Sequence, residues 1–216
     1  NIEAGDNVAG VSGAISVVAG SGQLSDGGDL RLTSGTAAAA NSTSGYVQLT
    51  SGTGLGGAST GSVELGSGSG GGVTGSVLLH TGSATAASSG DIAIATGSAV
   101  DGVAGDIGLV AGTGGSGVGG HLVLTSGAST EPEASSGGVR IGTAAALQTA
   151  AQTGGIDLTT GSGAQASGNI NIATGSSLSS SGGIVIETGL SRGASNDISL
   201  RVGESFSGSG GSINIQ

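Results

Sequence analysis

The chain has 216 residues, of which 50 are glycine, and it contains one Tyr, one Phe and no Cys, Met or Trp. This composition excludes a conventional core of large side chains. The net charge of -10 at pH 7 argues against nucleic acid and anionic membranes as partners. No apolar run approaches the ~20 residues that cross a bilayer, so we expect no membrane insertion.

A short motif, apolar-x-apolar-x-(Ser/Thr/Ala)-Gly, recurs along the chain, and its first apolar residue is called the head here. The heads are Ile15, Leu30, Val47, Val63, Val77, Ile92, Ile107, Leu122, Val139, Ile156, Ile170, Ile184, Ile198 and Ile213. A second apolar residue follows each head two positions later, and all 28 positions are Ile, Leu or Val. Successive heads are 14 to 17 residues apart. This regularity, with only 8% charged residues, argues against a disordered chain.

Each motif has the alternation of a short β-strand with one buried face. Gly, Ser, Ala and Thr between the motifs favour tight turns, and no helix is predicted. One such unit is too small to bury its apolar face, but stacked units form a continuous core. The sequence therefore predicts an all-β protein, a parallel β-solenoid (β-helix) with coils of about 14-17 residues.

Residues 1-216 are expected to form one continuous solenoid, a window of a longer repeat protein, since neither end carries a polar cap. Coils of one repeat and coils of two repeats both remain open. With one repeat per coil, Ile92 and Ile94 stack on Ile107 and Leu109. Smaller apolar residues, including Val100 and Val103, then line the opposite wall.

The longer repeats carry insertions, "TAAAANSTSG", "ASTEPEASSG" and "AALQTAAQTG", which we expect at one tolerant edge of the rod. The second contains Pro132, the only proline, where no strand N–H is needed. The first contains Asn41-Ser42-Thr43, an N-glycosylation sequon, so Asn41 is a candidate glycosylation site. A chance match is equally compatible with so much Ser and Thr.

A column of hydroxyl residues lies four positions after the heads: Ser34, Ser51, Ser67, Thr81, Thr96, Ser126, Thr143, Thr160, Thr174 and Thr188. Stacked threonines on a flat face are how several antifreeze proteins meet ice, which makes ice binding one hypothesis. Their position relative to the heads points them inward or into the corner of the coil, so mutual satisfaction of the hydroxyls and nearby backbone groups is the favoured interpretation.

An outward face turns small and apolar between about residues 76 and 126. Its members Leu78, Ala93, Ala95, Val110 and Val123 form a candidate lateral contact face. The irregularity of this face suits packing against another protein better than binding to a crystalline ligand such as ice.

No catalytic residue stands out, and the chain is not expected to be an enzyme. Two G-x-G-x-x-G matches, at 66-71 and 112-117, lead from strand to strand, whereas a nucleotide site needs a helix after the loop. Asp91, Asp106 and His121 directly precede heads in neighbouring repeats. We interpret the aspartates as acceptors of turn N–H groups; calcium is the weaker alternative, and no other cofactor is expected.

The stretch Gly-Asp-Ile-x-Ile-x-Thr-Gly-Ser at 90-98 resembles the Gly/Ser/Thr-rich tandem repeats of large secreted or surface proteins, including those predicted in algae and related protists. It is also similar to shorter-coil relatives of bacterial adhesin β-helices. The resemblance implies an extracellular or cell-surface location and a structural or adhesive role.

The leading functional hypothesis is a β-solenoid rod that builds or decorates an extracellular filament or surface appendage through end-to-end and lateral packing. Its partners would be further copies or other filament subunits. The alternatives are an ice-binding solenoid and an adhesin or polysaccharide-binding β-helix with glycan ligands. An aromatic platform for sugars is missing, which weakens the last of these.

Overall fold

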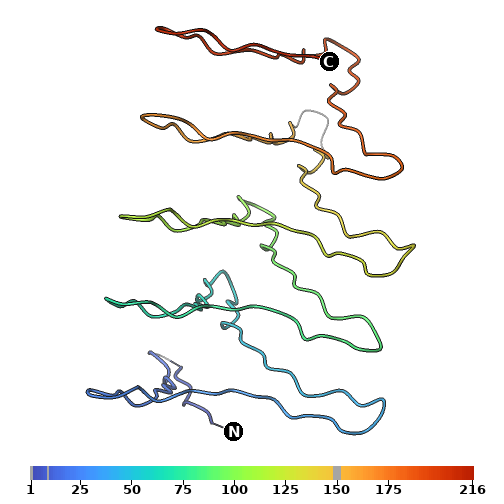
Figure 1. The fold of residues 1–216 in the computed structure, drawn as a ribbon. Helices are drawn as coiled ribbons and strands as arrows, with labels where there is room; N and C mark the ends of the chain where they lie inside the picture. Colours follow the sequence, from blue (N-terminus) through green and yellow to red (C-terminus); the bar gives the residue numbers. More distant parts are fainter. Residues whose placement is uncertain (1, 9, 148–151) are drawn as a thin grey trace. The chain divides into compact units, whose positions relative to one another are not determined.

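The computed structural model describes residues 2-8, 10-147 and 152-216, and within these ranges the chain forms no helix and no strand. Figure 1 accordingly shows a continuous extended and looping backbone. The prediction of a parallel β-solenoid is therefore wrong. The chain divides into two units, Asn1–Gly108 and Leu109–Gln216. Both carry the same sequence repeat, and the single-domain expectation stays a prediction.

Each repeat consists of an extended segment, which begins near the head, and a loop; where glycine precedes the next head by two positions, the two ends of the loop meet. We call the meeting point the junction: it joins the residues four and five positions after one head to the glycine two positions before the next. Backbone hydrogen bonds of 2.8 to 3.0 Å close five junctions, from the N–H of Gly13, Gly28, Gly45, Gly120 and Gly137 to the carbonyls of Gly5, Gly20, Gly35, Gly112 and Gly127.

The far end of each loop is a bend about midway between two heads. Bends occur at 23-25, 39-41, 56-57, 71-72, 85-87, 100-102, 115-117, 131-133, 164-165, 178-179, 192-193 and 206-208. Serine hydroxyls stabilise three of them by accepting the N–H two residues later, at Ser129, Ser177 and Ser191. Such local bonds are the reason Ser-rich sequences favour turns. The insertion at 145-154 lies partly outside the described residues.

The closed loops explain why the expected stacking is absent. The junction hydrogen bonds join residues 8 or 10 positions apart, whereas stacked coils need pairing between positions a full repeat apart. Ile92 and Ile107 are accordingly 49% and 52% exposed. Val100 and Val103 lie at or beside a bend, and each is 97% exposed. The predicted opposite wall is therefore not formed, because the loop turns back on itself.

No described residue is buried, so the described part of this single chain has no hydrophobic core. Its accessible surface is 21,286 Å². A compact monomer of this mass would expose about 8,600 Å², and a fully extended chain about 28,400 Å². The isolated chain is therefore much closer to the extended limit, and burial must come from outside it if the segments are to be stable.

Candidate contact surface

The aliphatic residues of the extended segments are the most prominent exposed feature of the chain. The heads are among its least exposed large apolar residues, at 49% to 62%, and Val202 is lower still, at 44%. Alternation thus survives locally, since the head Val77 is 55% exposed whereas the next residue, Leu78, is 80% exposed. We call the heads and their second apolar residues together the aliphatic series.

The predicted lateral contact face lies on the opposite side of the same segments. Leu78, Val110 and Val123 are 76% to 93% exposed, and Ala93 and Ala95 are also exposed. Because the aliphatic series is open as well, nothing sets these five residues apart from the rest of the segment. Their role as a lateral contact stays a prediction.

At the junctions the two ends of a loop approach each other closely, and glycine leaves room for this approach. A Cβ built on Gly13 would lie 3.1 Å from Ala4 Cβ. A Cβ on Gly45 would lie 3.3 Å from Ser34 Cβ, and one on Gly120 would lie 3.3 Å from Ala111 Cβ. These separations are tighter than ordinary van der Waals contact, so a side chain there would push the loop open.

The hydroxyl column takes part in these junctions. The Cγ2 methyl groups of Thr81, Thr96, Thr143, Thr160 and Thr174 are the side-chain atoms nearest to the glycine that closes each loop, at 3.5 to 3.8 Å from its built Cβ. At Ser34 the hydroxyl instead donates a 2.8 Å hydrogen bond to the carbonyl of Gly45. These contacts support a structural interpretation, although the residues touch the loop base and do not form a ladder of hydroxyls.

The junction glycines were missed by reasoning on strands, although the sequence contains a clear signal for them. Thirteen of the fourteen heads have glycine two positions before them, and the exception is Asn196 before Ile198. Strand propensity gives no reason for glycine at that place. A column of glycine at fixed distance from an alternating motif indicates close backbone approach.

Asn41 lies at the bend of the loop that follows Gly35. It has φ +62°, the only positive φ at a described residue other than glycine, and asparagine tolerates this conformation better than most residues. The N–H of Ser42 donates to the Ala39 carbonyl at 3.3 Å, which makes Asn41 the third residue of a turn. Asn41 is exposed to solvent, and glycosylation there stays a prediction.

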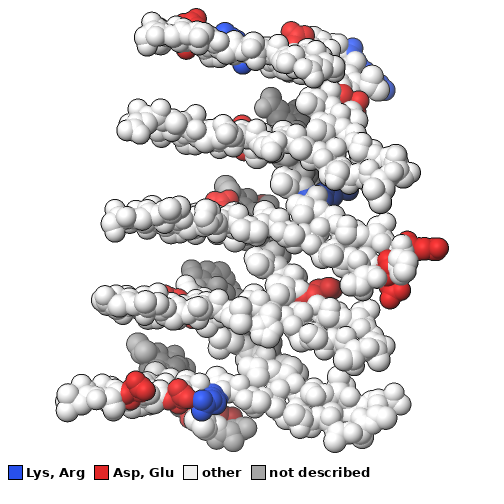
Figure 2. Space-filling model, viewed as in Figure 1, with Lys and Arg blue, Asp and Glu red and all other residues white. Residues whose placement is uncertain are grey.

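Charged side chains are sparse, and most of the surface in Figure 2 is neither acidic nor basic. Arg31 and Asp29 form an exposed ion pair within one extended segment. No hydrogen bond or ion pair joins the three described residues Asp91, Asp106 and His121. No group of three or more metal-ligating side chains occurs in the ranges the structure describes. Calcium binding and the absence of other cofactors stay predictions.

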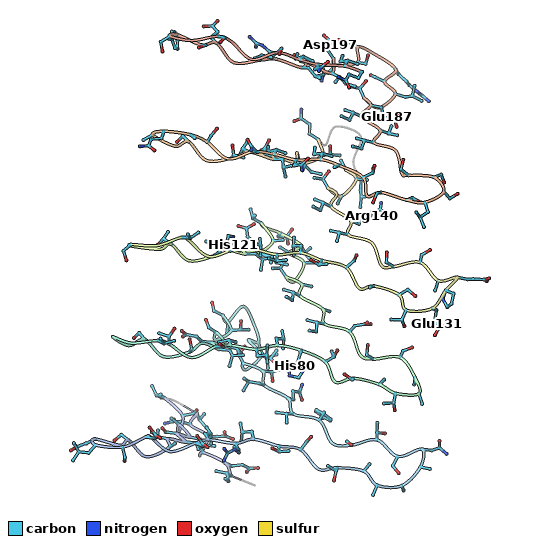
Figure 3. All side chains as sticks on the ribbon, in the orientation of Figure 1. His80, His121, Glu131, Arg140, Glu187 and Asp197 are labelled. Carbon is cyan, nitrogen blue, oxygen red and sulfur yellow. The ribbon has the colours of Figure 1, made fainter. Side chains whose placement is uncertain are left out.

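The remaining features offer little chemistry. The Nδ1 atom of His80 lies 3.2 Å from the carbonyl oxygen of the adjacent Thr81. His121 and Arg140 belong to other repeats (Figure 3). A solvent-exposed turn forms a depression that is lined by Glu131, Pro132, Glu133 and Ala134. Across this turn the Ala134 N–H donates a 3.3 Å hydrogen bond to the Glu131 carbonyl. In the described part of the chain, no helix is long and apolar enough to span a membrane.

No family model, curated protein or solved structure matches this chain. The functional argument therefore rests on the repeat itself, on the open aliphatic series and on the junctions.

Proposed function

We infer that this chain is a non-enzymatic structural subunit that builds or decorates an extracellular filament or surface appendage by associating with other chains. The observation that carries the proposal is the exposure of the whole aliphatic series, with no described strand pairing inside the chain. Exposed alternating segments with free backbone N–H and C=O groups are templates for pairing with another chain. Large exposed apolar areas mark interaction surfaces.

The amount of exposed surface favours permanent assembly over a transient encounter. The chain exposes about 12,700 Å² more than a compact monomer of its mass would expose. Obligate interfaces commonly bury about 2,000 to 5,000 Å² in total. A repeat protein that must cover its surface along its entire length fits a filament subunit better than a soluble enzyme or a signalling module.

The extracellular setting rests on the resemblance to secreted and surface repeat proteins and on the Asn41 sequon. The proposed partners are chains, and neither nucleic acid nor a membrane is expected. An adhesive role with a glycan ligand is the alternative within the same setting. Ice binding is less well supported, because the threonine column that would carry it lies against the loop junctions.

The test is the state of the purified full chain at rising concentration. We expect elongated assemblies in negative-stain micrographs, together with a far-ultraviolet circular dichroism signal that shifts from coil to β as the light-scattering mass increases. A chain that stays monomeric by light scattering at every concentration, with a coil spectrum, would contradict the structural-subunit proposal.

A further inference from the structure

Within residues 2-8, 10-147 and 152-216, no extended segment is paired as a strand with another segment of the chain. The junction hydrogen bonds use backbone groups at the ends of the segments. Between those ends, the aliphatic series and the intervening backbone stay open in the described part of the chain. A partner must therefore present an extended backbone with aliphatic residues at alternate positions, fourteen times over.

We propose that the partner is a further copy of this same chain, paired in parallel and in register, so that each extended segment lies beside the identical segment of its neighbour. This proposal rests on the proposed function, of which it specifies the partner and the mode of contact. A second copy carries a matching aliphatic pair at every head by construction. Parallel in-register pairing of identical segments also satisfies each backbone group of one copy with the next.

The loop lengths select this register over others. The spacings between heads run 15, 17, 16, 14, 15, 15, 15, 17, 17, 14, 14, 14 and 15 along the chain. Read backwards, or shifted by one repeat, the series no longer matches itself. Only an unshifted parallel copy therefore sets every closed loop beside a loop of the same length, so that no longer loop is left with unmatched residues.

The surface area agrees with an occupant that follows the whole chain. A single standard interface of ~1,600 Å² would leave most of the excess surface exposed. A copy that runs alongside all fourteen segments can cover the aliphatic series from end to end. The closed loops stay within each chain and need no rearrangement, because their junctions lie outside the paired stretch.

Because the chain has no cysteine, single introduced thiols report the register directly. Ala95 and Ala173 are a matched pair: each lies three positions after its head, in different units, and both are exposed. Identical positions on paired strands lie ~4.8 Å apart, within disulfide range. The Ala95→Cys chain, carrying a size tag, is mixed with the untagged Ala173→Cys chain in denaturant, assembled by dilution and then oxidised mildly.

We expect disulfides between two Ala95→Cys chains and between two Ala173→Cys chains, with mixed disulfides well below the share that random pairing gives. The same mixture oxidised in denaturant supplies that random share. Mixed disulfides at the random share, or assemblies that form no disulfide at either site, would overturn the in-register proposal while leaving a structural subunit intact. Absence of assembly by light scattering would overturn both proposals.

Discussion

At the scale of single residues, the junction glycines hold the repeat together. Gly120 donates a 2.9 Å hydrogen bond to the Gly112 carbonyl, and its missing side chain leaves room for Ala111. Gly112, on the acceptor side of the same junction, differs from Gly120, because a Cβ built on it would meet nothing within 4 Å. Two glycines of one junction therefore differ in what they tolerate.

We expect Gly120→Ala to open its loop, because the new methyl group crowds Ala111 and the backbone of Gly112. Loss of the junction hydrogen bond, worth about 1 kcal/mol, should speed exchange of the residue 120 amide by roughly fivefold. The measurement is amide hydrogen exchange by NMR. Gly112→Ala is the matched control and should leave that rate unchanged; equal acceleration in both variants would contradict a steric junction.

Asn41 combines a turn conformation with a sequon, and the two can be separated. Expression through a eukaryotic secretory pathway should add a glycan mass to the chain, because Asn41 is exposed at a bend. Asn41→Gly should abolish the added mass while retaining the turn, since glycine adopts φ +62° readily. Thr43→Ala should abolish it too. An unchanged intact mass of the secreted parent chain would show that the sequon is a chance match.

At the scale of the repeat, we expect the extended segment to take part in assembly and the loop bend to contribute little to it. Ile107 is a head in the aliphatic series, whereas Val118 lies beside a bend and is 87% exposed. Both are β-branched residues of an open chain, so a difference between them reports association and not the fold of a monomer.

We expect Ile107→Asn to weaken assembly, because burial of this side chain against a neighbouring copy would contribute about 1.5 to 3 kcal/mol. That corresponds to roughly a tenfold to hundredfold rise in the critical concentration for assembly. Val118→Asn should change it little. Sedimentation of dilution series measures both variants, and an equal effect of the two would place the contact at the bends.

Part of the structure of the repeat could be predicted from the sequence. The heads, the alternation around them and the position of the insertions between glycines all follow from the repeat. The alternation of Ile92 and Ile94 predicts an edge that needs a partner, but it does not say which chain supplies that partner. The repeat predicts stacking on Ile107 within the chain, whereas the structure closes the loops at their junctions. The glycine column before the heads was the signal for this difference.

At the scale of the whole molecule, charge opposes the proposed assembly. Each chain carries a net charge of -10, and parallel register would set Asp91 beside Asp91 and Asp106 beside Asp106 of the next copy, ~4.8 Å apart. Like charges at that distance repel unless they are screened.

We therefore expect assembly to strengthen with salt. Raising ionic strength from 0.01 M to 0.15 M shortens the screening length from ~30 Å to ~8 Å, so the critical concentration should fall. Asp91→Asn with Asp106→Asn should reduce this salt dependence. The readout is light scattering across a salt series. Assembly that weakens with salt would point to attraction between opposite charges as the main contact.

The closed loop makes the geometry of the junction independent of the length of the loop. In most repeat folds these two quantities are coupled. Loops closed across 8 and across 10 residues end in the same kind of junction, with hydrogen bonds of 2.8 to 3.0 Å. The extra residues of the longer loops lie between the two ends of the junction and leave its hydrogen-bond length within the same range. We therefore expect the tips to tolerate sequence changes, and foreign peptides inserted there should leave the junctions, and the pitch of the proposed polymer, unaltered.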